Sequence, residues 1–263
     1  GKNHSQAIYY GIPLHELIQM SVNGQFNPSF GKFTIRQAAA SDLNSLSGFF
    51  KSRLNIHQHL DWRTSLEWLG YQPYFLLFRE DEILAAIAAP VDPIEIAWIR
   101  VFGVQEQIPP EKIFSMLIER CVNYFTDENK PVIAALGLQE WFINTLEANN
   151  FIKHQEIVVL GWDYHQRPAR PIPSGLQIRQ MITADLPSVA QVDRQSFQPL
   201  WQNSLDALIL AFHKASIATV AVLNGSMFVD HISTSTPINT HLARVAVNPP
   251  FQRQNIGFAL VQD

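Results

Sequence analysis

The chain has 263 residues, which exceeds the usual size of one domain and makes two domains the default expectation. Hydrophobic residues make up 47% of the sequence, so the chain can bury complete cores and does not have the composition of a disordered protein. The formal net charge of −4 argues against a nucleic-acid partner, which requires a basic surface, and no apolar run is long enough to span a bilayer.

Cys121 is the only cysteine in the sequence. A lone cysteine provides no disulfide framework, which favours a reducing, cytoplasmic setting, and no signal-peptide pattern opens the chain. Cys121 lies in an amphipathic stretch with no feature that marks it as a nucleophile, so we predict a buried core thiol.

Residues 1–29 form an N-terminal extension whose role is not readable from the sequence. A first domain is expected over residues 30–164, opening with a strand and an amphipathic helix between Phe33 and Leu46. Further strands are predicted at 74–78, 83–88, 96–104, 132–136 and 155–160, and helices at 111–125 and 141–149. This alternation favours an α/β (α+β) fold, with mixed central sheets flanked by helices.

An internal repeat indicates two copies of one domain. The sequence from Phe33 matches, without a gap, the sequence that starts 143 positions later at Leu176, and both copies contain Ile-Arg-Gln, four residues, Asp-Leu, one residue and Ser. A second match, Arg100-Val101 with Arg244-Val245, has an offset of 144 positions. Solenoid repeats have periods of about 20 to 50 residues, so a period of this length indicates duplicated domains.

The second copy follows a proline-rich polar segment at 165–174, which is expected to be an extended linker because its three prolines disfavour a helix. The second domain, residues 175–263, should begin with a strand and a helix at 176–189. Strands are then predicted at 217–223 and 226–232, joined by an Asn224-Gly225 hairpin turn, and at 241–247, before a helix from Ile256.

The stretch from Leu242 to Leu260 carries the strongest functional signal. An apolar run predicts a buried strand, Pro249-Pro250 ends it, and a polar loop with one glycine opens an apolar helix. In this order the free backbone N–H groups of the loop and of the first helical turn point outward together, and the helix dipole favours an anion there. The pattern therefore predicts a pyrophosphate-binding loop.

This stretch resembles the acyl-coenzyme A signature of the GNAT superfamily of N-acetyltransferases, in which a strand ending in Val-x-Pro precedes Gln/Arg-x-x-Gly-x-Gly/Ala. Val247-Asn248-Pro249 matches the first part, and the residues from Gln252 to Gly257 match the second. Asn255 stands where the family has its first glycine, and asparagine tolerates a left-handed backbone well. The resemblance covers about residues 30 to 263 and implies tandem GNAT-like domains, the second ending before the last strands and helix of the fold.

The resemblance also implies acetyl-CoA as co-substrate, bound by the second domain. Pantetheine would pair like an added strand with the backbone of Val245, Ala246 and Val247. The pyrophosphate would lie on the backbone amides of the following segment, namely Gln252, Arg253, Gln254, Asn255, Ile256 and Gly257, with Phe258 and Ala259 close by. The Arg253 side chain has two interpretations, a charge-assisted contact to a phosphate or a solvated surface arginine.

Direct attack by an amine requires a group that removes its proton. In the family a carboxylate near the Val-x-Pro strand often does so, and this sequence has His241 near that place and Asp230-His231 on the preceding strand. An imidazole is suited to the task by its unperturbed pKa near 6.5, so His241 is one candidate and Asp230 is the other. The alternative interpretation of His241 is an exposed residue at the end of a strand.

The corresponding stretch of the first domain lacks these features. Residues 104–111 contain no glycine, two prolines, Glu106 and Glu111, so an anion would meet few N–H groups and some repulsion. We predict that this copy does not bind CoA and serves as a scaffold or substrate wall. His57-Gln58-His59 is too sparse for a metal site, so a solvated loop is preferred there and no metal is expected.

Together these features predict an acyltransferase that moves an acetyl group from acetyl-CoA to a primary amine by direct attack. The competing interpretation is a non-catalytic module of the same fold, which binds CoA or a partner without turnover, because Asn255 replaces a glycine and the carboxylate is absent. Acceptor pockets are built from variable loops, so a polyamine, an antibiotic, an amino acid and a protein N-terminus all stay open as acceptors. A homodimer also stays open, and neither nucleic acid nor a membrane is expected as a partner.

Overall fold

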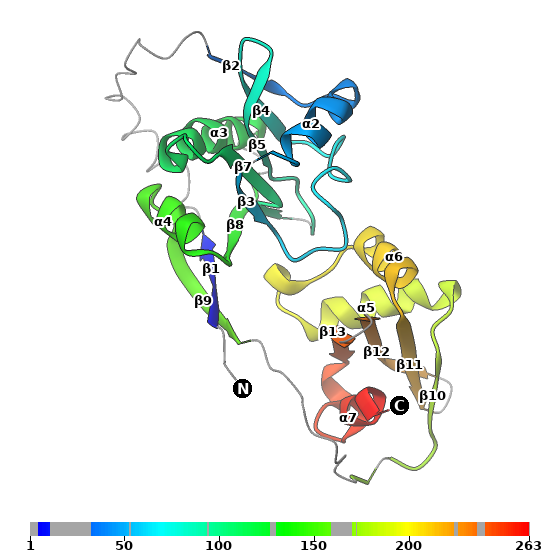
Figure 1. The fold of residues 1–263 in the computed structure, drawn as a ribbon. Coiled ribbons are helices and arrows are strands. Elements are labelled where there is room, and N and C mark those ends of the chain that lie inside the picture. The colour runs from blue at the N-terminus through cyan, green and yellow to red at the C-terminus, as the bar shows by residue number, and fades with distance from the viewer. Residues whose placement is uncertain are drawn as a thin grey trace. The chain divides into compact units, whose positions relative to one another are not determined.

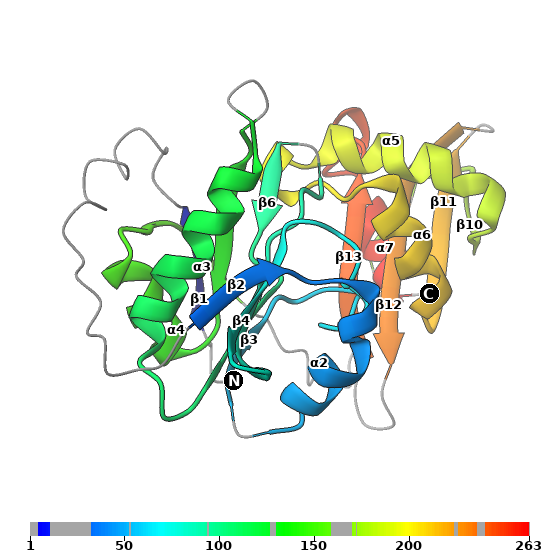
Figure 2. The ribbon, with the colours of Figure 1, turned by 90° about the horizontal axis from the view of Figure 1, so that it is seen from above.

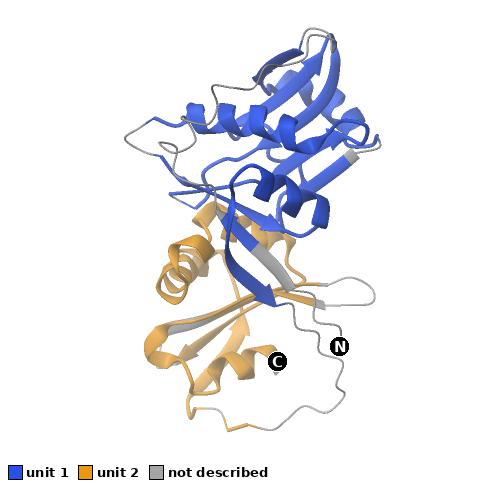
Figure 3. Ribbon diagram, turned by 90° about the vertical axis from the view of Figure 1, so that its left-hand side faces the viewer, with its two compact units in different colours: residues 1–161 blue, residues 162–263 orange. Residues whose placement is uncertain are grey.

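The computed structural model describes residues 5–10, 33–52, 54–93, 95–126, 130–158, 170–171, 173–223, 226–235 and 240–262. The chain divides into two compact units, Gly1–Gly161 and Trp162–Asp263 (Figure 3). Most of the predicted linker and the predicted Asn224-Gly225 turn lie outside the described residues. None of the described helices is long and apolar enough to cross a membrane.

The first unit contains two sheets. One has five antiparallel strands in the order β2 (Phe33–Gln37), β4 (Tyr74–Arg79), β5 (Glu82–Ala88), β7 (Val101–Gln105) and β3 (Leu54–Gln58). The other has four strands in the order β6 (Ile96–Trp98), β8 (Val132–Gly137), β1 (Ser5–Tyr10) and β9 (Ile152–Val158), of which β6 and β8 run parallel. The described part of this unit also contains the α-helices α2 (Leu43–Phe49), α3 (Pro110–Tyr124) and α4 (Glu140–Ala148) (Figure 1).

The core of this unit forms where α3 packs on β4, β5 and β7. Proline at the first helical position is favourable because its missing N–H has no partner there in any helix, and Pro110 starts α3 in this way. The helix turns Phe114, Leu117 and Cys121 inward, and none of the three side chains is exposed. Cys121 is thus a buried core thiol, as predicted, and burial raises the pKa of this thiol far above its ordinary value.

Two features of the first unit differ from the sequence prediction. The strand predicted at 96–104 is divided at Ile99-Arg100, where the chain leaves one sheet and enters the other. The strands β1 and β3 were not predicted, and β1 adds part of the N-terminal extension to the sheet between β8 and β9. The solvated loop preferred for His57-Gln58-His59 is wrong, because His57 lies on β3 with 1% exposure.

The second unit is one antiparallel sheet covered on both faces. Its strands follow the order β10 (Leu176–Gln180), β11 (Ile217–Leu223), β12 (Ser226–Ser235) and β13 (Thr240–Val247). Its α-helices are α5 (Leu186–Ser196), α6 (Leu205–Lys214) and α7 (Ile256–Gln262). Figure 2 shows α5 and α6 on one face of this sheet and α7 on the other.

The internal repeat has a counterpart in local structure. Arg36 donates two hydrogen bonds of 2.7 Å to the Asp42 carboxylate, and Arg179 donates two of 2.7 and 2.8 Å to Asp185. Each carboxylate also accepts the backbone N–H three residues before it, at 2.8 Å from Ala39 and 2.9 Å from Ile182. All three positions repeat at the offset of 143 found in the sequence. Each aspartate therefore fastens the end of a strand to the start of the helix that follows.

We expect Asp42→Ala and Asp185→Ala to lower the free energy of unfolding by similar amounts, about 1–2 kcal/mol each. Both aspartates have the same partners and both arginines are 45% exposed, so the lost backbone hydrogen bond outweighs the lost ion pair. Urea unfolding of the full chain measures the effect. Glu119→Ala, on an exposed position of α3, is the control, and a cost equal to the control in either variant would contradict the prediction.

Candidate functional site

The backbone of β13 has one free edge. β13 is the last strand of its sheet and pairs with β12, and no strand among the described residues pairs with its other side. Its side chains alternate between the two faces: Val245 and Val247 point to α7, and Arg244 points to α5. The register shifts at Ala243, which has no partner opposite it on β12. Such a bulge bends a strand, and the strand edge beyond it stays open for pairing.

Helix α7 lies close against this strand. A Cβ atom built on Gly257 would lie 3.2 Å from Cγ2 of Val247 and 3.8 Å from Cγ1 of Val245. A Cβ at this position would be closer to Val247 than an ordinary contact, so the Val247 side chain or the helix would have to shift. Ile256 and Ala259 are buried on the same helix, at 1% and 6% exposure. Gly257 thus fixes the distance between strand and helix.

The loop between them presents a row of backbone N–H groups. Arg253 and Asn255 have φ angles of 60° and 63°, so Asn255 adopts the left-handed conformation that the motif requires at this position. In the described part of the chain, no acceptor receives a hydrogen bond from the backbone N–H groups of residues 253–258. The Gln252 side chain donates to the Val247 carbonyl at 2.9 Å and holds the loop to the strand. Successive free N–H groups of this kind form an anion-binding concavity.

A second arginine, Arg170, lies near this loop, and the sequence did not indicate it. The Arg170 guanidinium lies 4.8 Å from the centre of the Phe258 ring, and the Asn255 side chain donates to the Pro171 carbonyl at 3.0 Å. Residues 170 and 171 were assigned to the linker because of their composition. Nothing local in a proline-rich segment predicts which surface it contacts, so Arg170 could not be found from the sequence.

The two candidate bases lie in different surroundings. His241 is exposed on β13, opposite Thr234 and four residues before Val245. Asp230 is fully buried on β12, opposite Ala246, so β13 lies between it and the free edge. The structure does not bring the two side chains together.

Asp230 belongs to a buried charge cluster below α5. Arg244 donates through Nε to Asp193 Oδ2 at 2.7 Å, forms a second hydrogen bond to it through Nη2, and donates to the Trp201 carbonyl at 2.7 Å. Neither carboxyl oxygen of Asp230 has a partner among the described residues. Burial and, to a smaller extent, the Asp193 carboxylate raise the pKa of Asp230, Arg244 opposes both effects, and the net pKa is about 7.

His231 is buried on the other face of the sheet. Its Nδ1 lies 3.2 Å from Thr219 Oγ1 and its Nε2 lies 2.5 Å from Ser233 Oγ. Burial lowers the pKa of His231, so the ring is neutral at physiological pH. Both ring nitrogens are occupied by hydroxyl groups of the sheet, which indicates a structural role.

Comparisons with solved structures identify the fold to which these two units belong. No family profile matches the chain, and no curated protein matches it. A GCN5-related N-acetyltransferase from Sphaerobacter thermophilus aligns with a TM-score of 0.55 and 15% identity, over 90% of this chain and 82% of that one. A glucosamine N-acetyltransferase region of a fungal multi-domain β-N-acetylglucosaminidase aligns with a TM-score of 0.52 and 11% identity, over 91% of this chain and 34% of that one. The chain has the fold of the GCN5-related N-acetyltransferases.

A third structure, the ribosomal-protein-S18-alanine N-acetyltransferase of Escherichia coli, is 23% identical over 33% of this chain. The chain spans only 55% of its length, and the TM-score of 0.31 is too low to support an argument. All three identities lie below 25%, so these likenesses show the GNAT fold and do not show the reaction.

The first unit differs from the second at the corresponding strand edge. There β3 pairs antiparallel with β7, from Leu54 opposite Gln105 to Gln58 opposite Val101. His57 strengthens the contact through a hydrogen bond of 3.1 Å to the Ile99 carbonyl and by stacking on Phe142 at 4.0 Å. The edge that is free in β13 is therefore occupied in β7 by the chain itself. No group of three or more metal-ligating side chains is found in the described ranges of either unit.

Proposed function

We propose that the protein is an acetyl-CoA-dependent N-acetyltransferase whose cofactor site lies in the second unit. One observation carries the proposal: the free edge of β13 leads directly into a loop whose backbone N–H groups have no acceptor among the described residues. A strand edge suits the amide-bearing pantetheine arm, because that arm can pair as an added strand. A row of free N–H groups suits a pyrophosphate. The two features adjoin in the order that a CoA molecule requires.

The residues present fit this cofactor. Backbone groups of Val245, Ala246 and Val247 would bind the pantetheine arm, and the free amides of residues 253–258 would surround the pyrophosphate. The Gln252 and Ala259 amides at the two ends of the loop already donate to the Pro249 and Asn255 carbonyls, at 3.2 and 3.0 Å. Arg253 and Arg170 add positive charge on two sides of the loop. We propose Arg170 as a binding residue beside those that the motif indicates.

Acetyl-CoA supplies a thioester whose carbonyl carbon is open to direct attack by a primary amine. The chain's own contribution is to orient the two reactants, to polarise the carbonyl through a strand amide near Val245, and to remove the proton of the amine. Our candidate for the base that removes this proton is His241, an exposed imidazole on β13. Asp230 is the weaker candidate, because it is fully buried and lies beyond β13 from the free edge.

The first unit, on this proposal, has a scaffold role. Its β7 edge is occupied by β3, and the loop after β7 contains Pro109 and Pro110, which offer no N–H group. The similar strand order of β2-β4-β5-β7 and β10-β11-β12-β13, together with the matching Arg–Asp pairs, supports two copies of one domain.

The backbone conformation at Asn255 provides the test. We expect Asn255→Gly to keep most of the acetyl-CoA binding, because glycine adopts a φ of 63° without strain and the exchange removes only the side-chain hydrogen bond to the Pro171 carbonyl. Asn255→Val should lose binding by about tenfold or more, because a β-branched residue disfavours that conformation and would turn the amides away from a common direction. Calorimetric titration of acetyl-CoA into the full chain measures both.

Equal binding by the glycine and valine variants would contradict the site. A thiol-release assay with a panel of primary amines then separates the enzyme from a binding module of the same fold. Release of free CoA in the presence of one amine supports the enzyme. Binding without release for any amine assigns the second unit to the non-catalytic alternative.

A further inference from the structure

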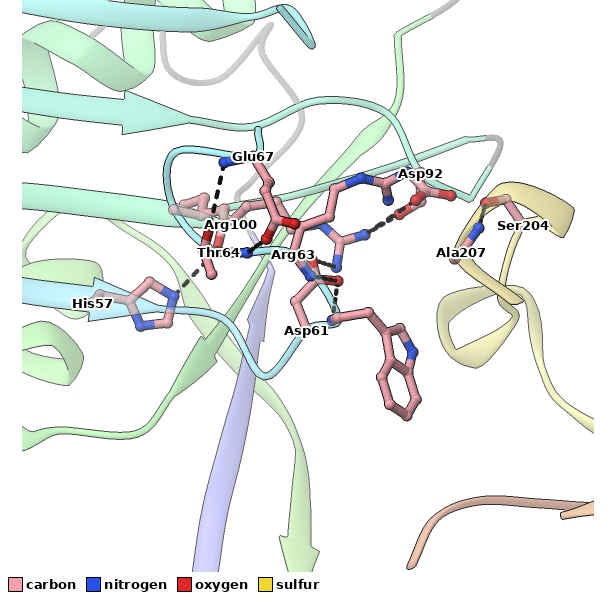
Figure 4. A network of polar contacts seen from close by, with 11 residues as sticks. His57, Asp61, Arg63, Thr64, Glu67, Asp92, Arg100, Ser204 and Ala207 are labelled. Atoms are coloured by element: carbon pink, nitrogen blue, oxygen red, sulfur yellow. Dashed lines mark hydrogen bonds and ion pairs between the residues drawn. The ribbon is translucent and has the colours of Figure 1, made fainter. Parts of the chain in front are cut away.

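A polar cavity of about 260 Å³ lies in the first unit, next to the end of β3. It is lined by Gln58, His59, Asp61, Trp62, Arg63, Thr64, Ser65 and Arg100. Figure 4 shows the network of polar contacts around Asp61 and Arg100. None of these residues belongs to the cofactor site proposed above, so the cavity requires an explanation of its own.

Arg100 anchors the cavity and keeps one donor unused. The residue is 8% exposed, and it donates through Nη1 to Asp61 Oδ2 at 3.1 Å and through Nη2 to the Asp92 carbonyl at 2.5 Å. Its guanidinium lies 4.9 Å from the centre of the Trp68 ring. Its Nε is buried without an acceptor in the described part of the chain. An unpaired buried N–H of a cation costs free energy, and an acceptor from a ligand would remove that cost.

Asp61 uses most of its hydrogen-bonding capacity within the chain. Its Oδ1 accepts the backbone N–H groups of Trp62 at 2.6 Å and of Arg63 at 3.3 Å, and its Oδ2 accepts from Arg100. Because its charge is already paired with Arg100, this carboxylate attracts a cationic ligand less than an unpaired one does. The cavity is therefore not suited to an ammonium group or to a metal ion.

His59 adds a neutral polar group. Burial lowers the pKa of His59 well below its ordinary value, and the charges of Arg100 and His57 lower it further. The ring lies against Trp98 with 4.7 Å between ring centres, and its Nδ1 is buried without a partner in the described part of the chain. A neutral imidazole with a free nitrogen can donate one hydrogen bond to an oxygen atom.

Arg63 supplies the charge for recognition. Its guanidinium lies 4.8 Å from the Trp68 ring centre and 4.9 Å from the Tyr71 ring centre, so uncharged aromatic faces position it. The charged side chains that line the cavity are Arg63, Arg100 and Asp61. Arg100 is balanced by Asp61 and by the Asp92 carboxylate, whose Oδ2 lies 4.0 Å from Arg100 Nη2, whereas Arg63 forms no ion pair with a carboxylate among the described residues. Arg63 is therefore the cation that is available to a ligand, and Arg100 Nε and His59 Nδ1 are polar atoms that lack a partner in the described ranges.

We propose that this cavity binds a small organic monocarboxylate, held by Arg63 and by the free donors of Arg100 and His59. One carboxylate matches the one cation of the cavity that has no carboxylate partner among the described residues, Arg63, and its two oxygens match planar guanidinium donors. A cavity of 260 Å³ corresponds to roughly eight water-sized volumes, which limits the ligand to a few heavy atoms beyond the carboxylate. A phosphate group, with about −1.5 to −2 charges at neutral pH, fits the charge of the cavity less well.

The test is a titration of the full chain with pyruvate, acetate, acetamide and inorganic phosphate at constant ionic strength. Intrinsic tryptophan fluorescence is the readout, because Trp62 lines the cavity and Trp98 packs on His59. Arg63→Met removes the recognition charge without removing the buried anchor. Arg79→Met removes the same charge at an exposed ion pair with Glu82 and is the matched control. Circular dichroism confirms that both variants are folded.

We expect saturable binding of pyruvate or acetate with a dissociation constant in roughly the millimolar range, and no binding of acetamide. Arg63→Met should weaken this binding about tenfold or more, and Arg79→Met should leave it unchanged. Saturating acetyl-CoA should not compete, which separates this site from the proposed cofactor site. The proposal is overturned if no carboxylate binds, if Arg63→Met binds as tightly as the control, if acetamide binds equally, or if phosphate binds more tightly than both carboxylates.

Discussion

Replacing Arg244 by methionine is expected to destabilise the second unit by about 3–5 kcal/mol. Arg244 is the cation of a buried cluster that also contains Asp193 and Asp230, both of which have 0% exposure. Without it the Asp193 carboxylate keeps, among the described residues, only donors of Asn203, namely its backbone N–H at 2.8 Å and its side chain. Removing one partner of a buried ion pair leaves an uncompensated charge, which costs more than the pair itself contributes.

Urea unfolding of the full chain, followed in the transition of the second unit, measures this loss. Arg194→Met removes the same charge from an exposed position of α5 and is the control. Adding Asp193→Asn to Arg244→Met should recover part of the loss, because the amide oxygen can still accept from Asn203 and no charge stays buried. Equal stability of Arg244→Met and Arg194→Met would show that the cluster does not contribute to folding.

The local elements of this fold were largely predictable from the sequence. The strand predicted at 217–223 is β11 without change, and the helix predicted at 111–125 is α3 within one residue at each end. Both have strong local signals, a run of β-branched residues in the first and a proline followed by helical periodicity in the second. The left-handed backbone at Asn255 was likewise readable, because it depends on one residue type in one loop.

The features that the sequence did not reveal depend on partners far along the chain. In β3 only Leu54 and Ile56 alternate with polar residues, a pattern too short to predict a strand, and pairing with β7 makes this segment a strand. The apolar run at 96–104 is interrupted only by Arg100, and β6 and β7 on its two sides have different neighbours. The residues on either side of this point do not indicate that the neighbouring strand changes there.

The candidate site shows the same division. Gly257 and the free loop amides follow from a local motif. The Arg244–Asp193 pair joins residues 51 positions apart, and Arg100 meets Asp61 across 39 positions. Charged side chains in apolar runs indicate that buried partners exist, but the sequence does not say which aspartate each arginine will meet.

Asp230→Asn is expected to make the second unit more stable than the unchanged protein above pH 7, although it removes a charged residue. The ordinary pKa of the carboxyl is 3.8, and burial together with Asp193 raises it to about 7 in the folded chain. Between these two values the folded chain binds more protons than the unfolded chain, so the free energy of unfolding falls as the pH rises. The raised pKa of Asp230 contributes to the free energy of unfolding in full below about pH 4. This contribution is lost as the pH rises through 7, and the loss is on the order of 4 kcal/mol.

An asparagine at position 230 does not titrate, so its variant should show little of this fall. Its amide replaces oxygens that have no partners among the described residues, so few hydrogen bonds are lost by the exchange. Urea unfolding at pH 5 and pH 8 measures the difference, with Asp206→Asn, on an exposed position of α6, as the control. A variant less stable than the unchanged protein at pH 8 would mean that the ionised carboxylate is needed in the fold. Because Asp230 is cut off from the free edge of β13, a stabilised variant that keeps its acetyltransferase turnover would also leave His241 as the remaining candidate for the base.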